Sequence, residues 1–87
     1  MSTSPQNPTT FVVMVGRTPV TAATQLEAAQ EHAAAEETHF RSTPPELWWD
    51  EPSPGHWRLM SRGTGQLRFL WTQRWIAAVP TITKDGA

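Results

Sequence analysis

The spacing of apolar positions changes along this chain, and each spacing predicts a different element. The run Phe11–Val15 is continuously apolar and rich in β-branched residues, which is typical of a central strand. Gly16 and Arg17 then predict a tight turn. Pro19–Thr21 predicts a short edge strand, because proline cannot donate a hydrogen bond to a neighbouring strand. The first part of the chain therefore predicts a β-hairpin.

Helical spacing follows the hairpin. Thr24 and Glu27 fit a capping box, in which each side chain bonds the backbone amide of the other residue. The residues up to Thr38 are mostly Ala, Glu and Gln, which are strong helix formers. One narrow apolar stripe recurs along this helix: Leu26, Ala29, Ala33 and Phe40. Because alanine is small, the helix can lie close to a sheet, and the sheet must then supply the bulky side chains.

The second half of the chain predicts strands. Pro44 and Pro45 end the helix. We expect strands at 46–50, 56–62 and 66–79, with a turn at 51–55 and a three-residue hairpin loop at 63–65. The last strand is one long element or two joined by a bend near Thr72 and Gln73. Its residues alternate between two sets, one with Leu67, Phe69, Trp71 and Trp75, the other with Arg68, Leu70, Arg74 and Ile76.

These elements predict an α+β fold. We expect a four- or five-stranded, mostly antiparallel β-sheet with a single α-helix packed on one face, in the order β-hairpin–α–β–β–β. A chain of 87 residues suffices for one domain. We place this domain at residues 10–82, between a disordered N-terminal tail at 1–9 and a C-terminal tail at 83–87.

Charge is segregated along the chain, although the net charge is −1. Residues 27–51 hold seven acids and one base, whereas residues 52–87 hold five bases and one acid. This asymmetry indicates either ion pairs between the two segments or two oppositely charged surfaces. Six of the seven basic residues are arginine, which favours bidentate and stacking contacts.

The composition also bears on the compartment. The chain has no Cys, which excludes disulfides, thiolate catalysis and Cys-based zinc sites. Residues 1–10 show neither the basic nor the apolar region of a secretory signal, and no early apolar run is long enough for a membrane helix. We expect a cytoplasmic protein that makes no membrane contact.

No motif for catalysis or phosphate binding is present. His32, Glu36 and His39 share a helix face and could approach a divalent metal together with His56. An exposed polar face near the helix end is the simpler interpretation. Adjacent acids such as Glu36 and Glu37 are interpreted as solvated charge, because carboxylates with perturbed pKa values are rare outside buried clefts. We expect no enzyme activity, no cofactor, no metal site and no small-molecule substrate.

The arginines and tryptophans of the C-terminal strands are the most informative feature. If Trp57 and Leu59 face the helix together with the set that contains Trp71, the other sheet face mixes guanidinium groups with aliphatic side chains. The members of this predicted Arg-rich face are Arg58, Met60, Arg62, Arg68, Leu70, Arg74 and Ile76. Trp48 and Trp49 must point to opposite sides of a strand, so one of them is a candidate anchor there. Burial of both, with the second covered by the N-terminal strand or a partner, is the alternative.

Three interpretations of the Arg-rich face remain open. The face binds a protein partner or a second copy, since Arg, Met and exposed aliphatic residues favour interfaces. Alternatively, it binds nucleic acid through Arg–phosphate and Trp–base contacts, against which the slightly negative net charge argues. In the third, the arginines pair with acids of the middle segment and no partner is involved. We favour a non-catalytic regulatory or adaptor module that binds protein, with a homodimer as one form, and keep nucleic-acid binding as the alternative.

A hairpin that runs into a Thr-capped, Ala-rich helix, from Val12 to Ala35, resembles the AP2-like arm-type DNA-binding domains of integrases. In those domains a three-stranded sheet precedes the helix, whereas here the three Trp- and Arg-bearing strands follow it. The similarity covers about a quarter of the chain, so it carries over neither function nor residues.

Overall fold

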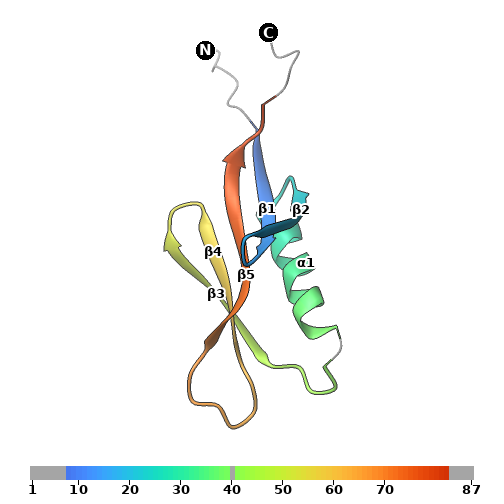
Figure 1. The fold of residues 1–87 in the computed structure, drawn as a ribbon, viewed down its shortest axis with the longest axis vertical. Helices are drawn as coiled ribbons and strands as arrows, with labels where there is room; N and C mark the ends of the chain where they lie inside the picture. Colours follow the sequence, from blue (N-terminus) through green and yellow to red (C-terminus); the bar gives the residue numbers. More distant parts are fainter. Residues whose placement is uncertain (1–7, 40, 83–87) are drawn as a thin grey trace.

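The computed structural model describes residues 8–39 and 41–82, which form one five-stranded antiparallel sheet and one helix (Figure 1). This confirms the predicted α+β fold, with five strands. In chain order the elements are β1 (Thr9–Val15), β2 (Thr18–Ala23), α1 (Leu26–Thr38), β3 (Glu46–Ser53), β4 (His56–Arg62) and β5 (Leu70–Pro80). Residues 1–7 of the predicted 1–9 tail, and the predicted tail at 83–87, lie outside the described residues, whereas Thr9 belongs to β1.

The strands follow the spatial order β2-β1-β5-β4-β3. β5 therefore lies between the N-terminal hairpin β1–β2 and the hairpin β3–β4, and joins them into one sheet (Figure 1). β1 is an inner strand and β2 an edge strand that contains Pro19, as the sequence predicts. β4 has the predicted bounds, and β3 extends three residues further than predicted, to Ser53.

The helix packs on β1, β5 and β2, and the core lies between these layers. The buried hydrophobic residues are Val13, Ala29, Ala33, Leu59 and Ile76. Phe11, Trp49 and Trp57 pack against this cluster and supply the bulk that the alanines of α1 lack. The predicted division into a small-residue helix and a bulky sheet is therefore confirmed.

The beginning of α1 differs from the prediction. Gln25 is the N-cap residue, with extended backbone angles and no side-chain capping bond. The predicted capping box of Thr24 and Glu27 is wrong because the helix begins one residue later than such a box requires. The helix ends at Thr38, as predicted. Ala29 and Ala33 of the apolar stripe are buried, whereas Phe40 lies outside the described residues.

The last strand is shorter than predicted. β5 begins at Leu70, and residues 63–69 form the connection from β4 in place of a three-residue loop. The irregularity expected near Thr72 and Gln73 is present. Gln73 has φ 74°, in the left-handed region, and the β4–β5 register shifts here, since Arg58 pairs with Trp75 while Met60 pairs with Trp71. Two additional residues of β5 are thus accommodated opposite one position of β4.

The register of β5 reverses the predicted sides of this strand. Ile76 pairs with Val13 and Trp57, is fully buried and faces α1. Arg74 also lies on the helix-facing side, whereas Trp71 and Trp75 point away from the helix. The predicted placement of the two sets was therefore wrong. Both sets contain large apolar residues, so alternation defines two sides without indicating which one the helix covers.

Candidate protein-binding surface

Among the described residues the helix packs on one side of the sheet, and we call the side away from α1 the open face. It is identified from the register, because β1, β4 and β5 place Val13, Leu59 and Ile76 against the helix and their neighbours on the opposite side. The members of the open face include Val12, Met14, Pro19, Ala22, Glu46, Trp48, Asp50, Ser53, His56, Arg58, Met60, Arg62, Trp71, Trp75 and Ala77. Every buried hydrophobic residue of the described chain lies on α1 or on the helix-facing side.

Large apolar side chains lie at the centre of the open face. Met60 of β4 is flanked by Trp48 of β3 and Trp71 of β5, which pair with it on either side. Trp48 is 51% exposed and Trp71 is 39% exposed. Met14 of β1 lies beside Trp75 in the next row of the sheet. Contiguous aromatic and methionine side chains, of which Trp48 and Trp71 are exposed and the others half-buried, are the composition expected of a surface that another molecule covers.

Hydrogen bonds and ring contacts fix the orientation of these aromatic residues. The indole Nε1 of Trp75 donates to the carbonyl of Gly16 at 2.8 Å, and the Trp75 and His56 rings lie 4.7 Å apart between centroids. The indole of Trp71 donates to the carbonyl of Arg74 at 3.2 Å. Because their rotamers are already fixed, these rings lose little conformational entropy on binding a partner.

A second aromatic group borders the open face where the 63–69 loop joins β5. Phe69 and Trp48 rings lie 5.9 Å apart, and the guanidinium of Arg62 lies 4.6 Å from the Phe69 centroid. This arrangement is a cation–π contact. It holds the end of the loop against β3 and β4. Phe69, which the alternation predicts as a strand residue, is therefore a loop residue whose ring packs on the sheet.

The arginines of the open face are paired within the chain. Arg58 binds Asp50, and Arg62 binds Glu46 at 2.7 Å, each acid lying directly opposite its arginine on β3. The Nε of Arg58 is buried and has no hydrogen-bond partner, so this pair satisfies the guanidinium incompletely. Cross-strand ion pairs neutralise this part of the face and leave its apolar residues as the distinguishing feature.

Arg74 lies on the other side of the sheet. Its Nε donates to Glu37 of α1 at 3.1 Å, and the two side chains are 20% and 13% exposed. Glu37 also pairs with Arg41 at 3.0 Å. Glu37 follows Ala33 by four residues and therefore continues the buried stripe of the helix, which is the sequence signal that predicts its contact with the sheet.

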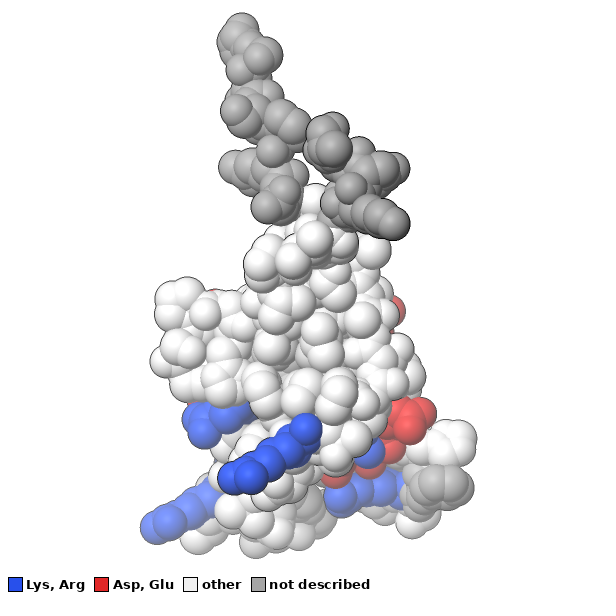
Figure 2. Space-filling view, turned by 45° about the horizontal axis from the view of Figure 1, so that its top comes forward, with Lys and Arg blue, Asp and Glu red and all other residues white. Residues whose placement is uncertain are grey.

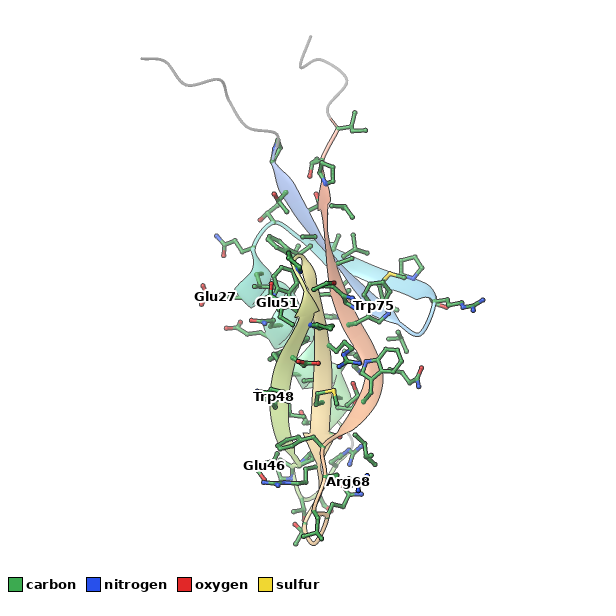
Figure 3. All side chains as sticks on the ribbon, turned by 90° about the vertical axis from the view of Figure 1, so that its left-hand side faces the viewer. Glu27, Glu46, Trp48, Glu51, Arg68 and Trp75 are labelled. Atoms are coloured by element: carbon green, nitrogen blue, oxygen red, sulfur yellow. The ribbon has the colours of Figure 1, made fainter. Side chains whose placement is uncertain are left out.

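The predicted Arg-rich face is consequently divided among three places. Arg58 and Arg62 lie on the open face, Arg68 lies in the 63–69 loop, and Arg74 faces the helix. Ile76 is buried against α1, and Leu70, which pairs with Ser61 on the helix-facing side, is 57% exposed. The prediction that all these residues share one face was wrong because it followed from the reversed sides of β5. Figure 3 shows Arg68 beyond the strands, far from Trp75.

The two adjacent tryptophans take opposite sides, as predicted. Trp48 pairs with Met60 on the open face, and Trp49 pairs with Leu59 and packs against the core. Of the two candidate anchors, Trp48 is therefore the exposed one. The sequence pattern predicted Trp71 and Trp75 in the core and placed neither Met14 nor His56 on a protein-binding surface.

Charged side chains are unevenly distributed over the surface. Figure 2 shows them gathered in the lower part of the view, below a broad area without charge. Among the ion pairs of the described residues, none involves Arg68 or Arg17. Within the described residues, the arginines outside these ion pairs are thus Arg17, in the β1–β2 turn, and Arg68, in the 63–69 loop.

The described part of the chain shows no further site geometry. It contains no pocket and no group of three or more His, Asp or Glu residues arranged to hold a metal ion, including the His32, Glu36 and His39 face of α1. Within residues 8–39 and 41–82, no helix combines the length and hydrophobicity needed to cross a bilayer.

Comparisons with known proteins do not assign this chain to a family. No family model matches it, and no curated protein and no solved structure is significantly similar to it.

Proposed function

We propose that this chain is a small, non-catalytic binding module that acts through a protein–protein contact made by the open face. The observation that carries the proposal is the exposure of Trp48 and Trp71 around Met60, on the side of the sheet away from α1. Tryptophan and methionine are enriched in interface centres, and tryptophan is prominent among the residues that dominate binding energy.

The electrostatics of the open face support a protein partner over nucleic acid. A phosphate backbone is bound mainly by free Lys and Arg side chains. Arg58 and Arg62 are already paired with acids on β3, and Arg74 is paired with Glu37 on the other side. Arg17 lies in the β1–β2 turn and Arg68 in the 63–69 loop, so neither belongs to a basic stripe along the strands of the open face. Nucleic-acid binding is therefore the second candidate.

A regulatory or adaptor role in the cytoplasm is part of the proposal. The absence of Cys from the sequence suits a reducing compartment. The lack of a pocket in the described residues favours recognition of a macromolecule over binding of a small ligand.

The test compares capture of host proteins by the wild-type chain and by a Trp48→Ala/Trp71→Ala variant. We expect the variant to lose the captured protein while its circular dichroism spectrum stays that of the wild type, because both indoles are exposed. His32→Ala is the matched control, since it removes an exposed ring from the opposite side of the molecule. Equal capture by all three chains would refute the proposal, and retention of labelled DNA or RNA at low salt would favour the second candidate.

A further inference from the structure

We propose that the partner of the open face is a second copy of this chain, which stacks its own open face on the first to form a symmetric two-sheet dimer. This inference rests on the proposed function, because it uses the same surface, and it names the occupant. In this dimer the two sheets stack on each other as a β-sandwich, and each helix lies on an outer side.

The size of the core gives the first argument. Between the sheet and α1, the described residues bury five hydrophobic side chains, two of which are alanines. Small domains compensate for a limited core with disulfides, metal ions or oligomerisation. The sequence has no Cys, and the described residues contain no metal-binding group. Burial of the open face is the remaining way to enlarge the core. A second copy can provide this burial, because it is present wherever the chain is present.

The relief of the open face gives the second argument. One row across the sheet holds small or flat side chains: Ala22, Val12, Ala77, His56 and Ser53. Two rows further along the strands lie bulky ones: Trp71, Met60 and Trp48. When two copies meet with their strands running in opposite directions, the bulky row of each lies over the small row of the other. The face is then self-complementary, as a two-fold interface requires.

Charge gives the third argument. The open face carries Arg58 with Asp50 and Arg62 with Glu46, so each positive group has a negative neighbour on the adjacent strand. Each pair is neutral, so the two faces bring no net charge of one sign into the contact. A strongly charged partner would have to compete with these existing pairs, whereas a second copy adds no unbalanced charge.

The area sets the strength of the contact. The bulky row spans only β3, β4 and β5, which are spaced about 4.8 Å apart, and the seven residues of β4 rise about 3.3 Å each. The shared face is then roughly 14 by 23 Å, or about 320 Å² from each copy and about 640 Å² in total, to which the β1–β2 hairpin adds only beside residues 74–80 of β5. This lies below the roughly 1,000 Å² of a stable interface, so we expect a weak dimer that forms at high concentration.

The experiment is sedimentation or multi-angle light scattering of the purified chain over a concentration series. The chain has a mass of 9.7 kDa, so the dimer is expected at twice 9.7, about 19 kDa, and should dissociate on dilution. Trp48→Glu/Trp71→Glu should remain a monomer at every concentration, with unchanged circular dichroism. His32→Glu places one negative charge on the exposed side of the helix and should leave the dimer intact.

A second measurement keeps Trp48 and Trp71 intact. Because the chain has no Cys, single cysteines report one position each. Facing sheets lie about 10 Å apart, so a short bismaleimide spans the gap where a disulfide does not. Pro19 lies in the row midway between the bulky and the small row, which faces itself in this stacking, whereas the small row that contains Ser53 does not. Pro19→Cys should therefore cross-link to its own copy more than Ser53→Cys does, and equal yields would overturn the proposed stacking.

The outcomes separate this inference from the proposed function. A wild-type chain that remains at 9.7 kDa at all concentrations overturns the second copy, while loss of capture by Trp48→Ala/Trp71→Ala still supports the open face as a site for another protein. A dimer whose mass is unchanged by Trp48→Glu/Trp71→Glu overturns the stacking of open faces. A dimer abolished by these substitutions supports it.

Discussion

Ile76 offers the sharpest test of the fold, because its position decides which side of β5 faces the helix. Its side chain is fully buried between Val13 and Trp57 on the sheet, in one cluster with Ala29 and Ala33 of α1. Ile76→Ala removes three carbon atoms from the middle of this cluster. The small alanines on the facing helix cannot move far enough to fill the space, so a cavity remains.

The expected cost is large relative to the stability of the domain. Truncation of a buried isoleucine to alanine destabilises by about 2–5 kcal/mol. A domain of 87 residues is stable by about 4–13 kcal/mol in total, from about 0.05–0.15 kcal/mol per residue. Ile76→Ala should therefore remove a large fraction of the free energy of unfolding.

Leu70 provides the matched control on the same strand. It is an aliphatic residue of the same size, but its side chain is 57% exposed and it lies outside the core cluster. Leu70→Ala loses less than half of the transfer free energy of a leucine and creates no enclosed cavity, so we expect a cost below about 1 kcal/mol.

The assay is urea unfolding followed by tryptophan fluorescence and by circular dichroism, with all chains at one protein concentration. A fixed concentration matters because self-association adds to the apparent stability of each variant. Equal losses at the two positions, or a greater loss for Leu70→Ala, would contradict the assignment of Ile76 to the helix-facing side.

Three further predictions concern single contacts. A double-mutant cycle on Glu37 and Arg74, with Glu37→Gln and Arg74→Met, should give a coupling of about 1–2 kcal/mol in urea unfolding, because both side chains are mostly buried; a coupling near zero would contradict the contact. Gln73→Gly should change stability by less than about 0.5 kcal/mol and Gln73→Val should cost about 1 kcal/mol or more, since φ is 74° there and β-branched residues avoid that region; the opposite order would argue against this backbone conformation. Gln25→Asp should raise the thermal midpoint by adding a side-chain cap worth about 1 kcal/mol, whereas Thr24→Ala should have little effect; a drop for Thr24→Ala would restore Thr24 as the cap.

The sequence alone determined those features that depend on neighbouring residues. The alanine-rich composition and helical spacing predicted α1 and its end at Thr38. Pro54 and Gly55 predicted the turn between β3 and β4. The opposite sides of Trp48 and Trp49 follow from the geometry of any strand. Each of these features is fixed within a few residues, so no knowledge of distant contacts is needed.

The tertiary structure decided which side of each strand is covered. Trp75 and Ile76 are both large and apolar, so the alternation along β5 is equally compatible with either side facing α1. The choice depends on the pairing of β5 with β1 and β4, and on the two additional residues around Gln73 that shift the β4–β5 register. The β1–β5 pairing in particular joins distant segments, since Val13 and Ile76 lie 76 − 13 = 63 residues apart in the chain.

Long-range strand pairing also decided which residues make up the open face. Arg58 and Arg62 were predicted there correctly, because β4 has one strongly apolar side, but Arg74 was exchanged for Trp75 when the sides of β5 were reversed. Charge segregation in the sequence indicated that arginines and acids could pair, and the register of β3 against β4 selected Asp50 and Glu46 as the partners. Local sequence therefore determines the elements, whereas the side that each presents to solvent is decided by long-range pairing, since burial is a property of the assembled sheet and helix.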